Sequence, residues 1–345
     1  MSNITVIGID LAKSVFQICG LNQANKLQFN ISVKRTKLVE TVLQHPHATI
    51  AMEACGSAHH WGRVFSELGY QVKLVPAQHV KGFSRGNKND ALDALAIAEA
   101  SQRPKVHFVA IKTIEQQDYQ TLLRARTRLI DERTATINQA RGTLAEYGVI
   151  LPRSVAAFKR GIPEIMGNAD NSLTPIIRTF IQTLYEDYQA LTRRINELNQ
   201  QLAAIATTHP VTKSLLRLRG VGPISAVAIY AGVGNGSQFK NARQLAAWVG
   251  LVPRQHGSGG VTRLGSISKR GSRYLRLLLI HGARAVMHWL GDKSDPLSLW
   301  AKQLIERRGR HKAVVAMANK TARMIWVVVR RGIEHVPDHH LSVAG

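Results

Sequence analysis

Short apolar runs alternate with amphipathic stretches over the first 110 residues, as they do in the strands and helices of one mixed sheet. The predicted strands are Ile4–Ile9, Val15–Leu21, Lys26–Ile31, Thr49–Glu53 and Gln71–Val75, and the predicted helices are Thr36–Leu43, His59–Leu68 and Asn89–Ala100. Three meandering strands followed by alternating helices and strands indicate a mixed α/β sheet.

The pattern changes to long helices over residues 111–207. An amphipathic stretch, Leu122–Leu144, is followed by a predicted loop rich in Gly, Pro and Asn, Gly148–Pro175, and by a second helix, Ile176–Ala206. Apolar residues of this second helix alternate in spacings of three and four. They are Ile181, Leu184, Tyr188, Leu191, Ile195, Leu198, Leu202 and Ile205. This heptad seam is long enough for a short coiled coil, and the alternative is one helix of an intramolecular bundle.

Residues 208–345 read as a third, helical part that contains two glycine-rich segments. The order is a helix at Leu215–Leu218, a turn at Gly220–Pro223, helices at Ser225–Tyr230 and Asn241–Val249, a loop at Gln255–Gly260, and long helices at Arg270–Leu290 and Pro296–Arg331. The chain is therefore expected to comprise an α/β domain at 1–110, a helical region at 111–207 and a basic helical domain at 208–345.

Charge is concentrated in that last part. It holds 22 Lys and Arg against 5 Asp and Glu, a net +17 out of +24 for the chain. No carboxylate occurs between Glu197 and Asp292. A folded segment of this charge would repel itself unless a polyanion neutralised it, which predicts DNA or RNA as the partner. An anionic membrane is the weaker alternative, because no polybasic amphipathic helix stands out.

Four carboxylates in the α/β part form the main candidate for chemistry: Asp10, Glu53, Asp90 and Asp93. Asp10 and Glu53 end apolar strands, whereas Asp90 and Asp93 share one face at the start of a helix. Oxygen ligands in this number suit Mg²⁺, with Mn²⁺ as a substitute, and two such cations can clamp a phosphodiester. The alternatives are helix-terminal charge for Asp90 and Asp93 and a plain loop start for Asp10.

The turn at Gly220 and Gly222 resembles the helix-hairpin-helix pattern of backbone N–H groups that face a phosphate. Lys213, Arg217 and Arg219 beside it favour a DNA contact, and a simple helix–helix turn is the alternative.

The second glycine-rich segment makes Ser258 accessible, and a serine can attack phosphorus when charge is stabilised and its proton removed. His256 is a candidate base, although no carboxylate lies nearby in sequence. A flexible glycine loop without chemistry is the alternative. Basic residues that could stabilise charge there are Arg254, Arg263, Lys269, Arg270 and Arg273.

Cys19 and Cys55 belong to no CxxC pair, so both are expected to be small, buried core residues in a reducing compartment. No signal sequence precedes the first strand, and the apolar runs are too short to span a bilayer. These features predict a cytoplasmic, nucleoid-associated protein without a membrane partner.

Two groups of motifs resemble a known family. Gly8-Ile-Asp10-Leu-Ala-Lys13, Glu53-Ala-Cys-Gly56 and Lys88-Asn-Asp90-Ala-Leu-Asp93 look like the RuvC-like (RNase H-like) half of the DEDD insertion-sequence transposases. The C-terminal motifs are Leu218–Pro223, Leu245–Arg254, Ser258-Gly-Gly260, Ser268–Gly271 and Arg273-Tyr-Leu-Arg276. The resemblance is to the insertion sequence 110 family, in its 1111 branch, which includes the Piv-type DNA invertases.

The resemblance implies a recombinase that excises an element and inserts it at a target, guided by a structured bridge RNA that pairs with donor and target DNA. By position, Asp10, Glu53, Asp90 and Asp93 would bind magnesium, and Ser258 would form a covalent phosphoserine link. It also implies that a coiled coil joins subunits into a tetramer, a dimer of dimers, in which different subunits can supply the two halves of a site. The predicted nucleic-acid contacts are Lys13, Lys88, Arg219, Gly220, Gly222, Arg254, Arg263, Lys269, Arg270, Arg273 and Arg276.

Two other function classes stay open at this point. A RuvC-like endonuclease would use water as its nucleophile and would not need Ser258. In an architectural DNA- or RNA-binding protein, the carboxylates would contribute to binding alone and not to a reaction. A serine hydrolase is disfavoured, because His256-Gly-Ser258-Gly-Gly260 does not fit GxSxG and no nearby carboxylate would complete a triad.

Overall fold

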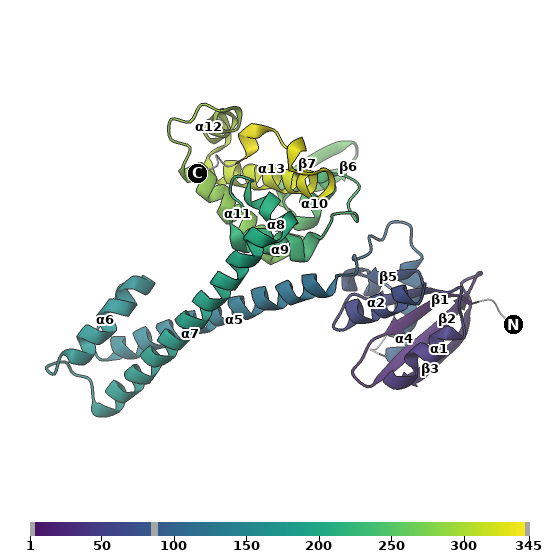
Figure 1. The fold of residues 1–345 in the computed structure, drawn as a ribbon, viewed down its shortest axis with the longest axis horizontal. Helices are drawn as coiled ribbons and strands as arrows, with labels where there is room; N and C mark the ends of the chain where they lie inside the picture. The colour runs from purple at the N-terminus through teal and green to yellow at the C-terminus, as the bar shows by residue number, and fades with distance from the viewer. Residues whose placement is uncertain (1–3, 84–88, 342–345) are drawn as a thin grey trace. The chain divides into compact units, whose positions relative to one another are not determined.

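The computed structural model describes residues 4–83 and 89–341 and divides into two compact units, Met1–Ile114 and Glu115–Gly345 (Figure 1). Each unit has its own core and is described by itself. The described part of the chain contains no helix with the length and apolar character needed to cross a membrane.

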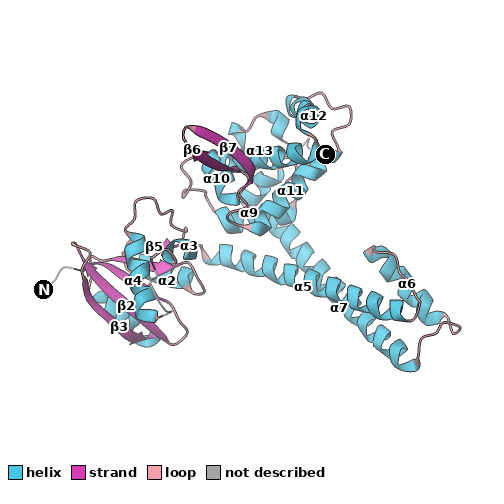
Figure 2. Cartoon of the chain, turned by 180° about the vertical axis from the view of Figure 1, so that it is seen from behind, coloured by secondary structure: helices cyan, strands magenta, loops and turns pink. Residues whose placement is uncertain are grey.

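A five-stranded mixed sheet organises the first unit, with strand order β3-β2-β1-β4-β5 (Figure 2). The first three strands are antiparallel neighbours, and β4 and β5 continue from β1 in parallel. The strands are β1 (Ile4–Asp10), β2 (Val15–Asn22), β3 (Leu27–Lys34), β4 (Thr49–Glu53) and β5 (Val72–Val75). This arrangement confirms the mixed α/β fold expected from the sequence.

Helices cover both faces of this sheet. One face packs against α1 (Leu38–Leu43) and α2 (Ala58–Glu67), and the other packs against α4 (Asp90–Ser101). The short η1 (Arg35–Lys37) and α3 (Ala77–Val80) complete the unit.

Helix α4 lies very close to β1, because the contact is built from small residues. A Cβ on Gly8 would collide with the Ala94 carbonyl and with Ala98. The buried Cys19 thiol also donates to the Ala94 carbonyl, at 3.2 Å. This close packing fixes the start of α4 beside the end of β1, where the predicted carboxylates lie.

A long antiparallel helix pair forms one end of the second unit: α5 (Ile114–Glu146) and α7 (Pro175–Thr208). The heptad seam of α7 is buried against α5 of the same chain. Leu191 and Ile195 cluster with Leu129. The structure therefore shows the intramolecular bundle, and this seam is already covered within one chain.

The prediction of a loop between these helices was wrong over one segment, which forms helix α6 (Val155–Gly167). Ser154 caps this helix by accepting from the Ala157 N–H, and Phe158 and Ile162 are fully buried against the α5–α7 pair. Burial of these side chains outweighs the local effect of the Gly and Pro residues that suggested a loop.

The rest of the second unit is a helical domain around α13. Its helices are α8 (Pro210–Leu216), α9 (Pro223–Val233), α10 (Ala242–Val249), α11 (Arg273–His288), α12 (Pro296–Arg308) and α13 (Arg310–Arg331), followed by η2 (Ile333–His335) and η3 (Asp338–His340). The last predicted long helix is two helices, because Gly309 has a φ of +78° and separates α12 from α13.

The segment predicted as a glycine loop is a β-hairpin. Strands β6 (Pro253–Ser258) and β7 (Val261–Ile267) pair in antiparallel fashion, and Gly259 and Gly260 form the two-residue turn with φ of +56° and +79°. A turn with two positive φ angles suits the twist of a tight hairpin and favours glycine at both positions. The glycines thus act as a turn between strands, which the sequence interpretation missed.

Candidate active site and nucleic-acid surfaces

The carboxyl edge of the first sheet holds the acidic residues. Asp10 is the last residue of β1, and Glu53 is the last residue of the parallel neighbour β4. Asp90 and Asp93 occupy the first turn of α4, whose N-cap Asn89 accepts from the Ala91 N–H. Parallel strands end at the same edge, so Asp10 and Glu53 lie on one edge of the sheet, and the start of α4 adds Asp90 and Asp93 near Asp10.

Three of the four carboxylates converge in the structure. Asp10, Asp90 and Asp93 each offer an oxygen atom, and these atoms lie within 4.8 Å of one another. Asp10 and Asp93 are half-buried, whereas Asp90 is exposed. Glu53 is outside this group. It lies on the neighbouring strand, because Met52, the residue before it, pairs with Ile9, the residue before Asp10.

The donor set fits a hard divalent cation. Carboxylate oxygens are the ligands that Mg²⁺ and Mn²⁺ prefer, and a cation retaining several waters needs only a few of them. The three carboxylates are close enough together for one cation to bind all of them.

Cys55 lies next to these acids, and the prediction that it is buried was wrong. Its side chain is exposed, whereas Cys19 is buried as expected. Partial desolvation raises the pKa of the Cys55 thiol, and the charges of Glu53 and Asp10 raise it further. The thiol is therefore less reactive than that of an ordinary exposed cysteine.

Lys13 is exposed in the loop after Asp10, where it can meet a phosphate. Lys88, the other basic residue predicted for this unit, lies outside the described residues.

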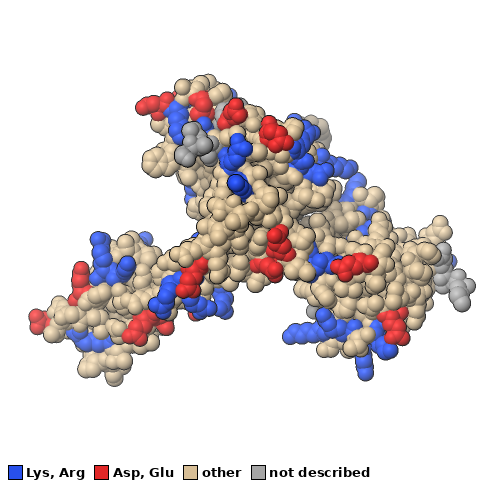
Figure 3. Space-filling view, viewed as in Figure 1, with Lys and Arg blue, Asp and Glu red and all other residues tan. Residues whose placement is uncertain are grey.

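In the second unit, exposed cations surround the hairpin. Figure 3 shows Lys and Arg side chains gathered along the part of this unit where β6 and β7 lie. His256 and Arg263 occupy paired positions in the ladder, and Ser258 pairs through its backbone with Val261 beside the turn. The side chain of Ser258 is outside the described part of the structure. The exposed basic residues here are Arg254, Arg263, Lys269, Arg270 and Arg273.

The predicted glycine turn is present between α8 and α9. Gly220 has a φ of +82°, and its backbone packs against Gly282 of α11 so closely that neither residue could carry a Cβ without a collision. Gly222 is the exposed N-cap of α9, and none of the side chains that the structure describes caps that helix end. Its free N–H groups suit an anion.

Two arginines predicted to contact nucleic acid are bonded within the protein. Arg219 donates from Nη1 to Asp295 Oδ1 at 2.9 Å and from Nε to the Leu341 carbonyl at 2.9 Å. Arg276 is buried, and its Nη1 donates to the carbonyls of Val249 and Arg270. These contacts give both arginines a structural role that residue type and position did not reveal.

Asp295 is the partner that holds Arg219. Burial opposes its ionisation, but hydrogen bonds from Ser298 and Arg219 outweigh that effect and lower the pKa of Asp295 to about 2. Asp295 also caps α12 by accepting from the N–H groups of Leu297 and Ser298. One carboxylate thus fixes both the glycine turn and a helix end.

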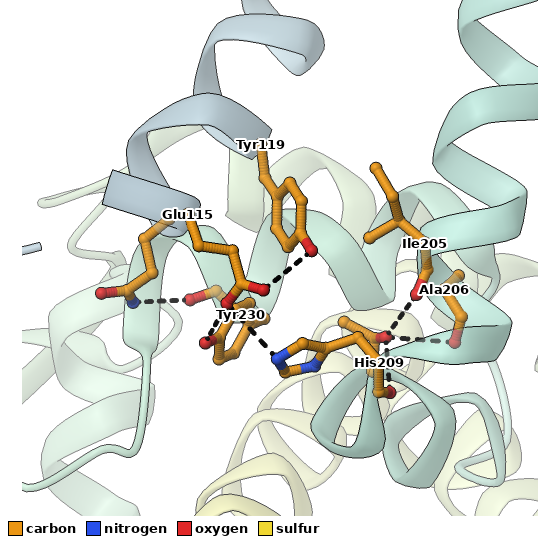
Figure 4. Close-up of polar contacts among 8 residues, drawn as sticks. Glu115, Tyr119, Ile205, Ala206, His209 and Tyr230 are labelled. Atoms are coloured by element: carbon orange, nitrogen blue, oxygen red, sulfur yellow. Dashed lines mark hydrogen bonds and ion pairs between the residues drawn. The ribbon is translucent and has the colours of Figure 1, made fainter. Parts of the chain in front are cut away.

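A polar cluster lies at the start of α5 (Figure 4), and no pattern in the sequence predicted it. Glu115 accepts from the Tyr230 hydroxyl at 2.7 Å and from the Tyr119 hydroxyl at 3.1 Å, and His209 Nε2 lies 3.5 Å away. The hydrogen bond from Tyr230 is the main reason that the pKa of Glu115 is lowered. These contacts anchor α5 to α9 and to the junction of α7 with α8, which is a structural rather than a chemical role.

Known protein families match segments in both units of the chain. Residues 7–149 match a transposase family model of the DEDD type, and residues 212–296 match the model described as "Transposase IS116/IS110/IS902 family". The chain is 44% identical to the transposase for insertion sequence element IS1111A of Coxiella burnetii, over 96% of this chain and 91% of the relative. It is 37% identical to the transposase for insertion sequence element IS1328 of Yersinia enterocolitica, over 96% and 98%.

A more distant relative is the pilin gene-inverting protein of Moraxella lacunata, at 22% identity over 95% of this chain and 96% of that protein. The two family models lie in the order in which the sheet unit and the basic helical domain follow one another along the chain. The chain therefore belongs to the IS110 family of insertion-sequence transposases, which are DNA-processing enzymes.

Proposed function

We propose that this transposase is a recombinase that excises an insertion sequence and inserts it elsewhere, using acidic residues of the first unit and Ser258 of the second. The observation that carries the proposal is the convergence of Asp10, Asp90 and Asp93 oxygens within 4.8 Å at the edge of the sheet. In a chain of net charge +24, such a cluster is suited to a cation that meets phosphate.

In this proposal the first unit is a RuvC-like domain, and Asp10, Asp90 and Asp93 hold Mg²⁺ or Mn²⁺ together with Glu53 from the neighbouring strand. When bound, the cation supplies Lewis-acid stabilisation of charge on a phosphodiester oxygen. The contribution of the protein is to fix these carboxylates on a strand end and on a helix packed tightly against it.

Ser258 is the proposed nucleophile. Its oxygen bonds to phosphorus, the bond from phosphorus to one sugar oxygen breaks, and that oxygen leaves with a proton while the serine hydroxyl loses one. The resulting phosphodiester to serine preserves the bond energy, so the reverse reaction can join a different strand end. The exposed cations Arg254, Arg263 and Lys269 near the hairpin can stabilise the charge that develops.

The exposed basic surface and the N-cap at Gly222 are proposed to hold the DNA backbone of donor and target. The relative named for pilin gene inversion supports strand cutting followed by rejoining as the reaction class. We further propose a bridge RNA as the guide and a tetramer as the active form, with the two half-sites able to come from different subunits. The functional segments proposed are 1–110, 111–207 and 208–345, and the protein is proposed to associate with the nucleoid.

The test is Ser258→Ala, assayed on DNA that carries the joined ends of the element, in Mg²⁺ and with RNA co-purified from cells. We expect loss of strand exchange and loss of a protein–DNA adduct that survives denaturation. Ser266→Ala is the matched control, because Ser266 is an exposed serine on the adjacent strand β7. Undiminished cleavage by Ser258→Ala without an adduct would instead establish a nuclease that uses water and would overturn the proposal.

A further inference from the structure

A hollow lies between α11 and α13. None of its lining residues belongs to the hairpin or to the glycine turn. It has a volume of about 460 Å³, which is within the range of small-molecule sites. Its lining residues are Arg284, Ala285, His288, Trp289, Arg310, His311 and Val314.

The lining is cationic, and the described residues provide no ion-pair partner for its two arginines. Arg284 and Arg310 are exposed, and in the described part of the structure neither forms an ion pair. The lining residues include two histidines and no carboxylate. Two guanidinium groups around one hollow are suited to bidentate recognition of a phosphate.

An aromatic ring stands at the rim of the same hollow. Trp289 follows the last turn of α11 and is 70% exposed, and its ring makes an edge contact with His288 at a centroid distance of 5.1 Å. Exposing so much indole to water is unfavourable, and a flat apolar surface beside arginines suits a stacked nucleobase.

We propose that this hollow binds one unpaired nucleotide of a single-stranded nucleic acid. Arg284 and Arg310 bind its phosphate, and Trp289 stacks on its base. A base within a duplex is already stacked on both sides and cannot present its face to Trp289, so the site selects a strand that is unpaired at this point. The inference rests on the proposed function only in that this chain meets nucleic acid, and it requires neither the carboxylates nor Ser258.

The experiment measures binding of the full chain to ten-nucleotide rU and dT strands and to a ten-base-pair duplex, in EDTA so that no cleavage occurs. Trp289→Leu should weaken binding of the single strands about 5- to 100-fold, the range expected for loss of one stacked base, and change duplex binding less than twofold. Trp289→Phe should retain most of the affinity because a ring remains.

The phosphate half of the site is tested with Arg284→Gln and Arg310→Gln. Each should weaken single-strand binding, and the double variant should lower the slope of log affinity against log salt by about 0.7, the value for one phosphate contact on a single strand. Lys240→Gln is the control, because it removes one exposed charge that does not line the hollow. A larger effect on rU than on dT would assign the ligand to RNA, and the opposite result would assign it to single-stranded DNA.

The proposal is overturned if Trp289→Leu leaves single-strand binding unchanged, or if it weakens duplex and single strand equally. Because the assay contains no metal, a failed Ser258→Ala test of recombination would leave this result unaffected.

Discussion

Arg219 and Asp295 form an ion pair of 2.9 Å that joins the glycine turn to the start of α12, with only 17% of the Arg219 side chain exposed. The pair links positions 76 residues apart and lies beside Gly220, whose backbone packs against Gly282. A residue that the sequence suggested as a phosphate contact thus also maintains the turn.

Asp295→Ala should lower the free energy of unfolding by about 2 kcal/mol, because it removes the α12 cap and leaves Arg219 without its carboxylate. Asp295→Asn keeps an N-cap and should cost less. Urea unfolding followed by tryptophan fluorescence measures both variants. Glu306→Gln, an exposed change on the same helix, should be neutral.

The same pair predicts a pH dependence. The pKa of Asp295 is lowered from 3.8 to about 2 in the folded protein, so the unfolded chain binds the proton more readily. The stabilisation is complete above the higher pKa and is lost as the pH falls toward the lower one. The advantage of the native protein over Asp295→Asn should therefore shrink from about pH 4 to about pH 2. An advantage that stays constant over this range would contradict the assigned pKa.

Gly282→Ala should destabilise the protein, although alanine favours helix, because its methyl group would collide with the backbone of Gly220. We expect a loss of at least 1 kcal/mol from this overpacking. Gly142→Ala is the matched control in helix α5, where a Cβ meets nothing within 4 Å, and it should stabilise by about 0.5–1 kcal/mol. Opposite signs in thermal unfolding would support the close contact, and equal signs would contradict it.

Leu191→Ala should lower the free energy of unfolding by about 2–4 kcal/mol, because Leu191 is 7% exposed and packs on Leu129 of the same chain. Arg194→Ala, on the exposed face of the same helix, should change it little. Light scattering on the folded variant should give an unchanged mass. A fall in mass would mean that this seam also joins subunits.

Mn²⁺ should raise the melting temperature of the native protein, because the folded chain brings together carboxylate oxygens of Asp10, Asp90 and Asp93 that can bind it. Asp93→Asn should remove most of that increase. Glu99→Gln is the control, since Glu99 lies on the same helix outside the cluster. An increase that is equal in Asp93→Asn and in the native protein would argue against a metal site here.

The sequence by itself determined the elements that depend on local patterns. The strand ending at Glu53 was predicted to the residue, and the apolar run ending near Asp10 and the helix starting near Asp90 were predicted to within one residue. Strand periodicity, the Asn89 cap and the three-residue spacing of Asp90 and Asp93 are all local signals. They were enough to predict a carboxylate cluster, and the structure brings three of its four members together.

Some sequence patterns are compatible with more than one set of contacts, and only the tertiary structure decided which contacts form. The heptad seam of α7 fits a partner helix from any chain, and α5 of the same chain covers it. Arginine suits phosphate and carboxylate equally, and only folding brings Asp295 to Arg219 and two carbonyls to Arg276. Glycine permits both a loop and a tight turn, and strand pairing made the Ser258 segment a hairpin. A local pattern fixes which contacts a residue is able to make, whereas the partner that satisfies them comes from distant parts of the chain.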